Sequence, residues 1–445
     1  MRRHESIAIT AVTLAGVLVS AGANAQKPPA IRELGRLERV TSDSLASVAA
    51  ALPLPGGRVL VNDTKSRRLI VLDSTLAHPT IVFDTTSVTS NAYGSGSGTL
   101  IRFRGDTALF IAPYSLSMFV ISPAATIARV LAIPRPDDAQ ALLGIFGTPG
   151  FDARGRMLYF RGLGSLPGML MLGRGSPPPQ MTGLMAQMFP VGRTDSAAVV
   201  RVDLSTRVLD TAASVRIPKS KREFKLDAQG MLQAIETTPD PLPLVDAWTL
   251  LPDGSLAVIR ARDYHVDWLD ADGRWSSTPK MPFDWQRVSD ERKQTLIDSA
   301  VKASQAGYDQ VEASRRRGPT GGSGRGGAGG RGAGSGGAGG GPAIELAPTI
   351  AIPPSLNDLP DYAPPFKQEA GPSPVRADAD GNIWIRTTTM VKDRPVYDVV
   401  NRRGELFDRV QLPAFRTVAG FGPGVIYMAM KDSAGVVRLE RAKVK

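Results

Sequence analysis

Short alternations of hydrophobic and polar residues recur along the chain, each introduced by a glycine. In the clearest copies a glycine begins a strand-like stretch, a loop follows, and a second such stretch ends at a polar turn. These copies run from Gly57 to Asp73, from Gly254 to Asp270 and from Gly381 to Asn401. Alternation with a period of two, bounded by Gly, Asp and Asn, predicts paired β-strands.

A fourth copy begins at Gly155, but its second stretch arrives only at Ala197–Asp203, after a long insertion. Two further copies, which begin at Gly105 and Gly424, fit the pattern more loosely. Copies also tend to have one strand-like stretch before them and one after them, as Val245–Leu251 precedes the Gly254 copy. Six units of four strands predict an all-β fold, a six-bladed β-propeller.

The last unit is one strand short at the C-terminus. Ile31–Val40 is an isolated strand-like stretch with nothing local to pair with. We expect it to supply the outer strand of the final blade, because closing the ring in this way removes open sheet edges.

Two regions interrupt the repeat. Residues 164–195 form a Gly-, Pro- and Met-rich insertion in the third blade, which is either an adaptable binding surface, a lid over the channel or a poorly ordered flap. Residues 289–317 have helical spacing, with Ser289 as the N-cap. Residues 318–341 are almost only Gly, Ala, Ser and Arg, and are expected to be a disordered linker between the fourth and fifth blades.

The first 25 residues have the pattern of a signal peptide. Arg2 and Arg3 precede the apolar stretch Ile7–Val19, and Ala23-Asn24-Ala25 is a cleavage motif that would leave Gln26 first. The alternative is a retained membrane anchor. The propeller then spans 26–445, exported to the periplasm or secreted. The chain has no cysteine, so neither a disulfide nor a lipid-bearing cysteine is available.

Composition and charge narrow the class of partner. The 445 residues are 42% hydrophobic and 21% charged, which suits a globular protein with a core. Lys and Arg outnumber Asp and Glu by 53 to 42, a net charge of +11. In an exported protein with scattered basic residues this favours an anionic ligand, an acidic surface or a polyanion over nucleic acid.

Two segments carry a family resemblance. They are DAWTLLPDGSLAVIRARDYHVDWLDADGRW (Asp246–Trp275) and the stretch from DADGNIWIRTT to YDVVNRRGELFDRVQLP (Asp378–Pro413), with weaker likeness over Pro53–Asp73. They resemble the six-bladed propeller superfamily that includes NHL-repeat and TolB-like proteins, and more closely uncharacterised exported propellers of environmental bacteria. The superfamily hosts lactonases, oxidoreductases, peptide cyclases and binding scaffolds, so the resemblance implies a fold and leaves function open.

Residues suited to catalysis are scarce. Beyond the first 25 residues the only histidines are His78 and His265, and G-x-S-x-G and H-E-x-x-H motifs are absent. The Asp-x-Asp-Gly stretches at Asp270 and Asp378 lack the later bidentate acid of a calcium loop and read better as tight turns. We therefore predict no catalytic residue, metal ligand or cofactor.

Aligning the blades on their glycines gives one candidate binding site. Polar residues fall where the glycine-led strand of each unit ends. The equivalent loops of all blades in a propeller emerge on one face. The candidate ligand-binding residues are Asn62, Asp63, Arg161, Arg260, Asp263, Arg386 and Lys431. They would bind an anion or polar ligand at the channel mouth. The alternative is ordinary polar capping of exposed loops.

The five tryptophans are expected to be mainly structural. Trp248, Trp268 and Trp384 lie in alternating strands, where packing between blades explains them. Trp285 is the one expected to be exposed.

These observations favour a non-enzymatic, exported binding scaffold that takes a protein, peptide or envelope component through one face. One alternative is a metal-dependent, lactonase-like hydrolase in the central channel, for which only Asn62, Asp63 and Asp263 are available as ligands. Another is a structural envelope protein. The oligomeric state stays open.

Overall fold

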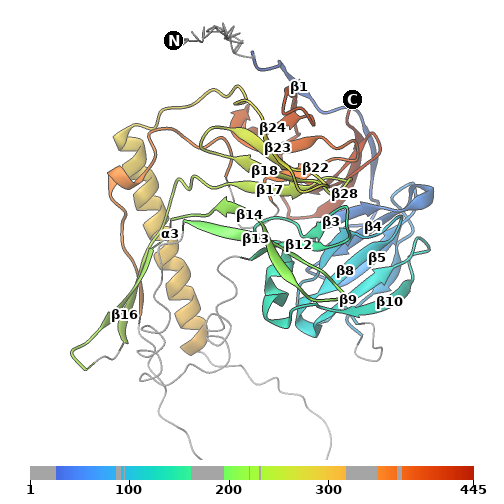
Figure 1. Ribbon diagram of the computed structural model, residues 1–445, viewed down its shortest axis with the longest axis horizontal. Coiled ribbons are helices and arrows are strands. Elements are labelled where there is room, and N and C mark those ends of the chain that lie inside the picture. The colour runs from blue at the N-terminus through green and yellow to red at the C-terminus, as the bar shows by residue number, and fades with distance from the viewer. Residues whose placement is uncertain are drawn as a thin grey trace, which may run out of the picture.

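Six sheets of four core strands form the body of the protein in a computed structural model (Figure 1). The structure describes residues 27–86, 92–94, 96–161, 195–219, 221–229, 232–316, 348–367 and 373–445. Each sheet is antiparallel in its core strands, and consecutive sheets follow one another along the chain. We call them blades one to six, and the predicted six-bladed propeller is the observed fold.

The first three blades take up the N-terminal half of the chain, with the first-named strand of each nearest the propeller axis. Blade one is β3 (Ala50–Pro53), β4 (Val59–Asp63), β5 (Arg68–Leu72) and β6 (Thr80–Phe83); blade two is β7 (Thr99–Arg102), β8 (Ala108–Ala112), β9 (Ser117–Ile121) and β10 (Ile127–Ala132); blade three is β11 (Gly150–Phe151), β12 (Met157–Arg161), β13 (Ser196–Val202) and β14 (Leu209–Arg216).

The other three blades follow the same order. Blade four is β17 (Ala247–Leu250), β18 (Leu256–Arg260), β19 (His265–Leu269) and β20 (Trp275–Ser277); blade five is β22 (Val375–Ala377), β23 (Ile383–Val391), β24 (Arg394–Val400) and β25 (Leu406–Gln411); blade six is β26 (Arg416–Gly422), β27 (Val425–Lys431) and β28 (Val437–Lys443), with β2 (Leu37–Val40) as its outer strand.

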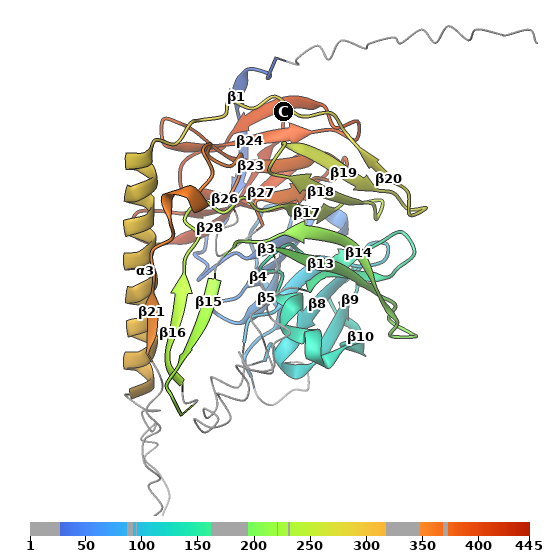
Figure 2. The same ribbon diagram turned by 60° about the vertical axis from the view of Figure 1, so that its left-hand side comes forward.

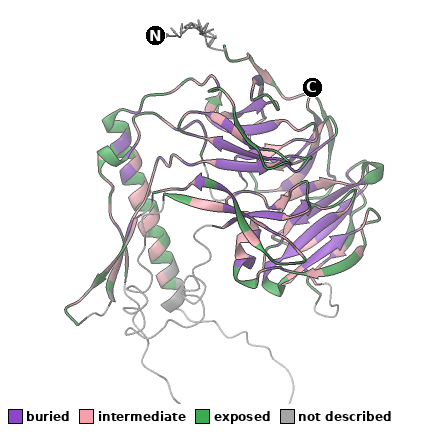
Figure 3. Cartoon of the chain, in the orientation of Figure 1, coloured by how far each residue is buried: buried purple, intermediate pink, exposed green. Residues whose placement is uncertain are grey.

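The second strands of the first four blades, β4, β8, β12 and β18, are buried at nearly every position, which explains why their sequences are mostly apolar. In β4, Val59 and Val61 pack with residues of blade six, while Leu60 packs with Phe110 of blade two. Alternate side chains of a strand point to opposite faces, so each strand contributes to two inter-blade cores. Figure 3 shows this as buried strands with exposed turns.

The N-terminal segment closes the ring in two pieces instead of the single strand expected over 31–40. β1 (Ile31–Glu33) pairs in parallel with β25 at the outer edge of blade five, and β2 pairs antiparallel with β28 of blade six. Gly35 lies between them, where an added Cβ would come within 2.6 Å of the Lys443 carbonyl oxygen. The close approach turns the chain from one blade edge to the next.

A small sheet and one long helix stand beside the blades, as Figures 1 and 2 show. The helix, α3 (Asp290–Arg316), begins after Ser289, whose Oγ accepts from the Arg292 amide at 3.2 Å, as the N-cap prediction requires. The strands β15 (Lys221–Leu226) and β16 (Leu232–Thr238) form a hairpin that the sequence analysis missed, and β21 (Thr349–Ala351) joins it in parallel. The hairpin precedes blade four and β21 follows it, so this sheet joins two insertions.

Several predicted segments lie outside the described residues. They are the signal peptide (1–25), nearly all of the 164–195 insertion and the Gly-rich stretch 318–341. Among the helices that the structure describes, none is long and apolar enough to cross a membrane.

Candidate functional site

All of the predicted binding residues except Arg386, which lies within β23, are at or beside the turns between the second and third strands of the blades. Asp63 is wholly buried there. Its carboxylate accepts from the backbone amide of Ser47 at 2.8 Å and pairs with Arg68 Nε at 3.0 Å. Ser47 belongs to the segment that enters blade one from blade six. Burial alone would raise the pKa of Asp63, but hydrogen bonds from Ser66, Ser47 and Ala46 outweigh it and lower the pKa. Asp63 therefore fixes a connection between blades.

Asn62, next to Asp63 in the chain, also holds a connection between blades in place. Its side-chain nitrogen donates to the Gly98 carbonyl at 2.9 Å, and its oxygen accepts from the Tyr93 hydroxyl at 2.6 Å. Both partners lie in the connection from blade one to blade two. The amide is buried, and both of its ends are used within the fold.

Arg161 pairs with an acid that the sequence analysis did not select. Its Nε donates to Asp138 Oδ1 at 3.1 Å, and the hydroxyl of Tyr159 donates to Asp138 Oδ2 at 2.8 Å. Arg135 also donates to Asp138, at 3.1 Å. Asp138 lies in a 3-10 helix, η3 (Pro136–Leu143), in the connection from blade two to blade three.

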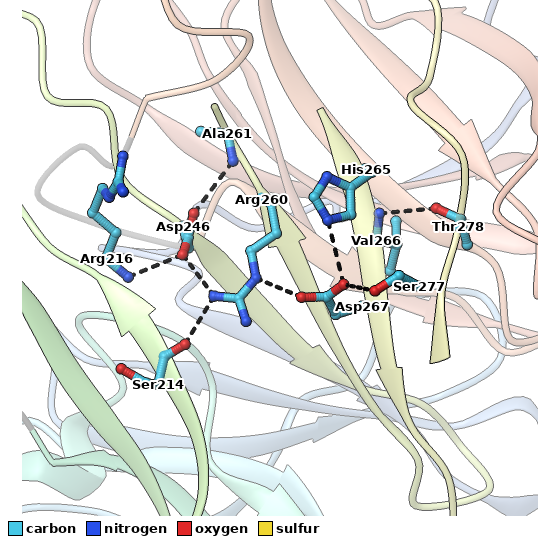
Figure 4. Close-up of polar contacts among 10 residues, drawn as sticks. All are labelled: Ser214, Arg216, Asp246, Arg260, Ala261, His265, Val266, Asp267, Ser277 and Thr278. Carbon is cyan, nitrogen blue, oxygen red and sulfur yellow. Dashed lines mark hydrogen bonds and ion pairs between the residues drawn. The ribbon is translucent and has the colours of Figure 1, made fainter. Parts of the chain in front are cut away.

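Arg260 is at the centre of the polar network in Figure 4. Its Nη1 donates to Asp246 at 2.8 Å and to the Ser214 carbonyl at 2.8 Å, and its Nε donates to Asp267 at 2.7 Å. Asp246 also accepts from the backbone amide of Arg216 at 3.0 Å. Burial would lower the pKa of Arg260, but the two carboxylates outweigh it and raise the pKa. The guanidinium thus links blade four to blade three.

His265 and Ser277 share Asp267 with that arginine. His265 Nε2 lies 3.3 Å from Asp267 Oδ1, and the Ser277 hydroxyl donates to the same oxygen. Burial would raise the pKa of Asp267, but Ser277 and Arg260 together lower it. Serine and histidine both contact the acid and are not bonded to one another, so this is not the serine–histidine–acid chain of a nucleophilic site.

The other three candidates lie apart from this network. Asp263 pairs with Lys280 at 3.0 Å on the surface, which lowers the pKa of the carboxyl. Lys431 is exposed at the end of β27. Arg386 falls five residues after its blade glycine, whereas Arg161 and Arg260 fall six residues after theirs, so strand alternation directs its side chain to the opposite blade face.

The structure therefore brings Asp63, Arg161 and Arg260 into equivalent inter-blade contacts without making them one open, convergent ring. Among the described residues, no group of three or more His, Asp or Glu side chains is placed to hold a metal ion. The role of these residues in ligand binding stays a prediction.

A cleft of about 230 Å³ opens between blades three and four. It lies on the face of the propeller opposite the turns between the second and third strands. Leu158, Leu256 and Leu269 contribute to its lining and belong to the core between these two blades. The turn before β12 forms one wall, and Gly254 packs against it, where an added Cβ would lie 2.2 Å from the Ala153 amide nitrogen. The cleft thus has an apolar floor and polar walls.

Arginine and tryptophan stand at the mouth of this cleft. Arg156 pairs with Asp152 at 2.7 Å, and Arg201 pairs with Asp210. Arg154 is exposed, and within the described part of the chain its guanidinium has no hydrogen bond or ion pair.

Trp275 also lines the cleft and is 48% exposed. The expectation that Trp285 is the exposed tryptophan is wrong: Trp285 is partly buried against the blade four and five core, packed on Phe283. Trp275 lies on the outer strand of its blade, which leaves one face of the ring open to solvent. Trp248, Trp268 and Trp384 are buried, as expected.

Comparison with known proteins gives distant structural likenesses. No protein-family model matches the chain, and no curated protein matches it. A protein from Bacteroides fragilis described as exported is similar at 9% identity and a TM-score of 0.42, over 93% of this chain and 95% of that one. Regucalcin, a calcium-binding protein from Agrobacterium tumefaciens, has 10% identity and a TM-score of 0.37, over 93% and 97%.

Virginiamycin B lyase from Staphylococcus aureus is similar at 9% identity and a TM-score of 0.36, over 92% of this chain and 99% of that one. At these identities and scores the likenesses say nothing about function here. The fold itself is given by the strand pairing described above.

Proposed function

We propose that the protein is an exported, non-enzymatic binding scaffold that takes an acidic segment of a protein or peptide in the cleft between blades three and four. The observation that carries this is the cleft's combination of three features: an Arg154 guanidinium with no partner among the described residues, a half-exposed Trp275 and a leucine floor. An arginine offers paired donors to a carboxylate, and an indole offers a flat apolar surface beside it.

The size of the cleft favours a segment of a larger partner. Pockets for small molecules usually measure about 300–1,000 Å³, whereas this cleft measures about 230 Å³. It has room for a few side chains. Affinity would then come mainly from an arginine and an aromatic anchor within a wider contact surface.

Site-specific photo-crosslinking tests the proposal. Because the chain has no cysteine, a single introduced cysteine can be labelled uniquely with a benzophenone maleimide. We expect a label at Thr211→Cys, in the cleft lining, to crosslink a protein or peptide from envelope extract of the source cells. A label at Lys65→Cys, on the opposite face, should not capture the same species.

Two substitutions supply the affinity test. Arg154→Glu with Trp275→Leu should weaken capture at least tenfold, and raised salt should weaken capture by the unchanged chain. Lys65→Glu makes the same charge change as Arg154→Glu away from the cleft and should leave capture intact. Equal capture by the cleft variant and the Lys65 variant would refute the cleft as the binding site.

Export is part of the proposal and has its own test. The pattern of residues 1–25 supports removal of a signal peptide after Ala25. N-terminal sequencing of the protein from the periplasm or medium should begin at Gln26. Recovery of the uncleaved chain in the membrane fraction would instead support the anchor.

A further inference from the structure

The small sheet beside the blades has one open edge. Its strand order is β15–β16–β21, so among the described residues β15 pairs with β16 alone. At the other edge β21 lies against α3, where Gln305 Oε1 accepts from the Ala351 amide at 3.0 Å. Figure 1 shows the β15–β16 hairpin reaching away from the blades. Such an edge presents backbone N–H and C=O groups to which another strand can add.

Charges of both signs alternate along one face of β15. Lys221, Glu223 and Lys225 are two residues apart, so they lie on the same face of the sheet. Asp227 follows two residues later, just past the end of the strand. Charged side chains often protect open edges, because charges of one sign repel a second strand. On β15 the two signs instead occur in an order that complements its own reverse.

This order selects one way for two copies of β15 to pair. In an antiparallel pair with Phe224 opposite Phe224, on the twofold axis between the copies, Glu223 of each copy lies opposite Lys225 of the other. Lys221 then lies opposite Asp227, and such directly opposite side chains interact. Moving the axis by one residue sets Glu223 opposite itself or Lys225 opposite itself. The charges therefore favour a single register.

The pairing would also relieve a shortage of positive charge within the single chain. Glu223 lies directly opposite Glu236 of β16, and like charges in this position destabilise a sheet. One lysine serves both acids: Lys225 Nζ lies 3.1 Å from Glu236 and 3.3 Å from Glu223. These two carboxylates raise the pKa of Lys225. Lys225 of a second copy would give Glu223 a lysine of its own.

The other face of the strand offers an aromatic contact at the axis. Phe224 is half-buried and lies opposite Ile235, on the side of the sheet where the Thr237 hydroxyl donates to the Tyr308 hydroxyl of α3 at 2.9 Å. In the paired register the two Phe224 rings would meet, and aromatic cross-strand pairs stabilise sheets. The result is a continuous sheet with three strands from each copy and both α3 helices on one side.

We propose that two copies of this chain associate through β15, paired antiparallel about Phe224. The contact is a pair of six-residue strands, which belongs to the small and weak class of interfaces. We therefore expect a monomer at the dilution of a size-exclusion column and a dimer in concentrated solution. The proposal is separate from the cleft between blades three and four and does not depend on it.

Sedimentation velocity of the chain beginning at Gln26, followed up to high concentration, tests the proposal. We expect the sedimentation coefficient to rise toward that of a dimer, and high salt to weaken the association. Glu223→Lys and Lys225→Glu, each alone, set like charges opposite one another and should raise the dissociation constant at least tenfold. A mixture of these two variants restores both opposite-charge pairs and should associate as the unchanged chain does.

Lys65→Glu is the matched control, because it makes the same charge change as Lys225→Glu in an exposed turn of blade one. It should associate as the unchanged chain does. The mixture separates a lost contact from a damaged hairpin, because mixing restores the charge pairs and cannot refold a strand. A sedimentation coefficient of the unchanged chain that does not rise with concentration, or a mixture no better than the single variants, would overturn the proposal.

A crosslink tests the register without any change of charge. The chain has no cysteine, so Phe224→Cys supplies its single thiol, and the register sets position 224 of the two copies about 5 Å apart between Cα atoms. That distance suits a disulfide. Mild oxidation in concentrated solution should give a covalent dimer, and Gln229→Cys, exposed in the hairpin turn, should crosslink far more slowly. Equal rates for the two variants would contradict the pairing about Phe224.

Discussion

Tyr264 and Asp398 form a fully buried hydrogen bond between blades four and five. The Tyr264 hydroxyl donates to Asp398 Oδ2 at 2.7 Å, and Arg409 Nε donates to the other carboxylate oxygen at 3.0 Å. Burial raises the pKa of both Tyr264 and Asp398. The acid depends on these two donors, because water does not reach it.

Removing one of these two donors should therefore destabilise the folded protein. We expect Tyr264→Phe to lower the free energy of unfolding by about 1–3 kcal/mol, the usual cost of a buried polar group left short of a partner. Tyr114→Phe, at a side chain that is 53% exposed, should change it little. Urea denaturation followed by tryptophan fluorescence measures both, and equal stability of the two variants would contradict the prediction.

Asp63 gives a prediction for acid pH. Its pKa in the folded protein is lowered, below the value of about 3.9 in an unfolded chain. Its stabilising contribution is thus present above the unfolded value and is lost as the pH falls through the folded one.

In the Asp63→Asn variant this source of pH dependence is absent. We expect the free energy of unfolding to fall less steeply between about pH 5 and pH 2 than it does in the unchanged protein. Asp272→Asn, in an exposed turn, should keep the original slope. Denaturation curves at several pH values decide between them.

Several residues of the contacts between blades could be predicted from the sequence, but their partners could not. Asp63, Arg161 and Arg260 could be found by counting from the blade glycines. Their acceptors and donors, such as Asp138 and Asp246, lie in irregular connections between blades, where no periodicity predicts which side chain turns inward. A charged residue at a strand end looks the same in sequence whether it faces a ligand or a neighbouring loop.

At the scale of the element, two glycines in regular secondary structure lead to opposite predictions for the effect of substitution by alanine on stability. Gly420 in β26 packs against β3, where an added Cβ would lie 1.9 Å from the Ala51 carbonyl oxygen. Gly307 in α3 has nothing within 4 Å of that position. One glycine is required by close approach, and the other only weakens its helix.

We expect Gly420→Ala to destabilise the protein by about 1–3 kcal/mol or more, because the inner strands must separate. Gly307→Ala should instead stabilise α3 by up to about 1 kcal/mol through helix propensity. Thermal unfolding measures both, and each variant controls for the other. A stable Gly420→Ala protein would mean that β26 and β3 can move apart freely.

The strands of the repeat and the long helix were predictable, whereas the small sheet outside the repeat was not. The glycine-led strands of all six blades follow from alternation, and α3 from its spacing and the Ser289 N-cap. The β15–β16 hairpin lies outside the repeating unit. Its parallel partner β21 is more than a hundred residues further along the chain, and such a pairing has no local signal.

At the scale of the whole molecule, the N-terminal segment ties blades five and six to the start of the chain. Arg32 Nη2 lies 2.7 Å from Asp408 of β25, and Arg441 of β28 pairs with Glu38 at 3.2 Å. The sequence predicted closure by this segment. Its division over two blades depends on the contact of Gly35 with the end of β28, which is visible only in three dimensions.

A chain beginning at Thr41 should therefore unfold at lower urea concentration than one beginning at Gln26. It lacks β1 and β2, so the outer edges of β25 and β28 present unpaired backbone groups, and open edges favour pairing between molecules. We expect its mass in light scattering after size exclusion to rise with concentration. Arg32→Gln removes the ion pair with Asp408 and the hydrogen bond to the Val444 carbonyl but keeps both strands. It should lose some stability while its mass stays independent of concentration. If the shortened chain were as stable as the longer one, with a mass independent of concentration, the blades would hold the ring closed without this segment.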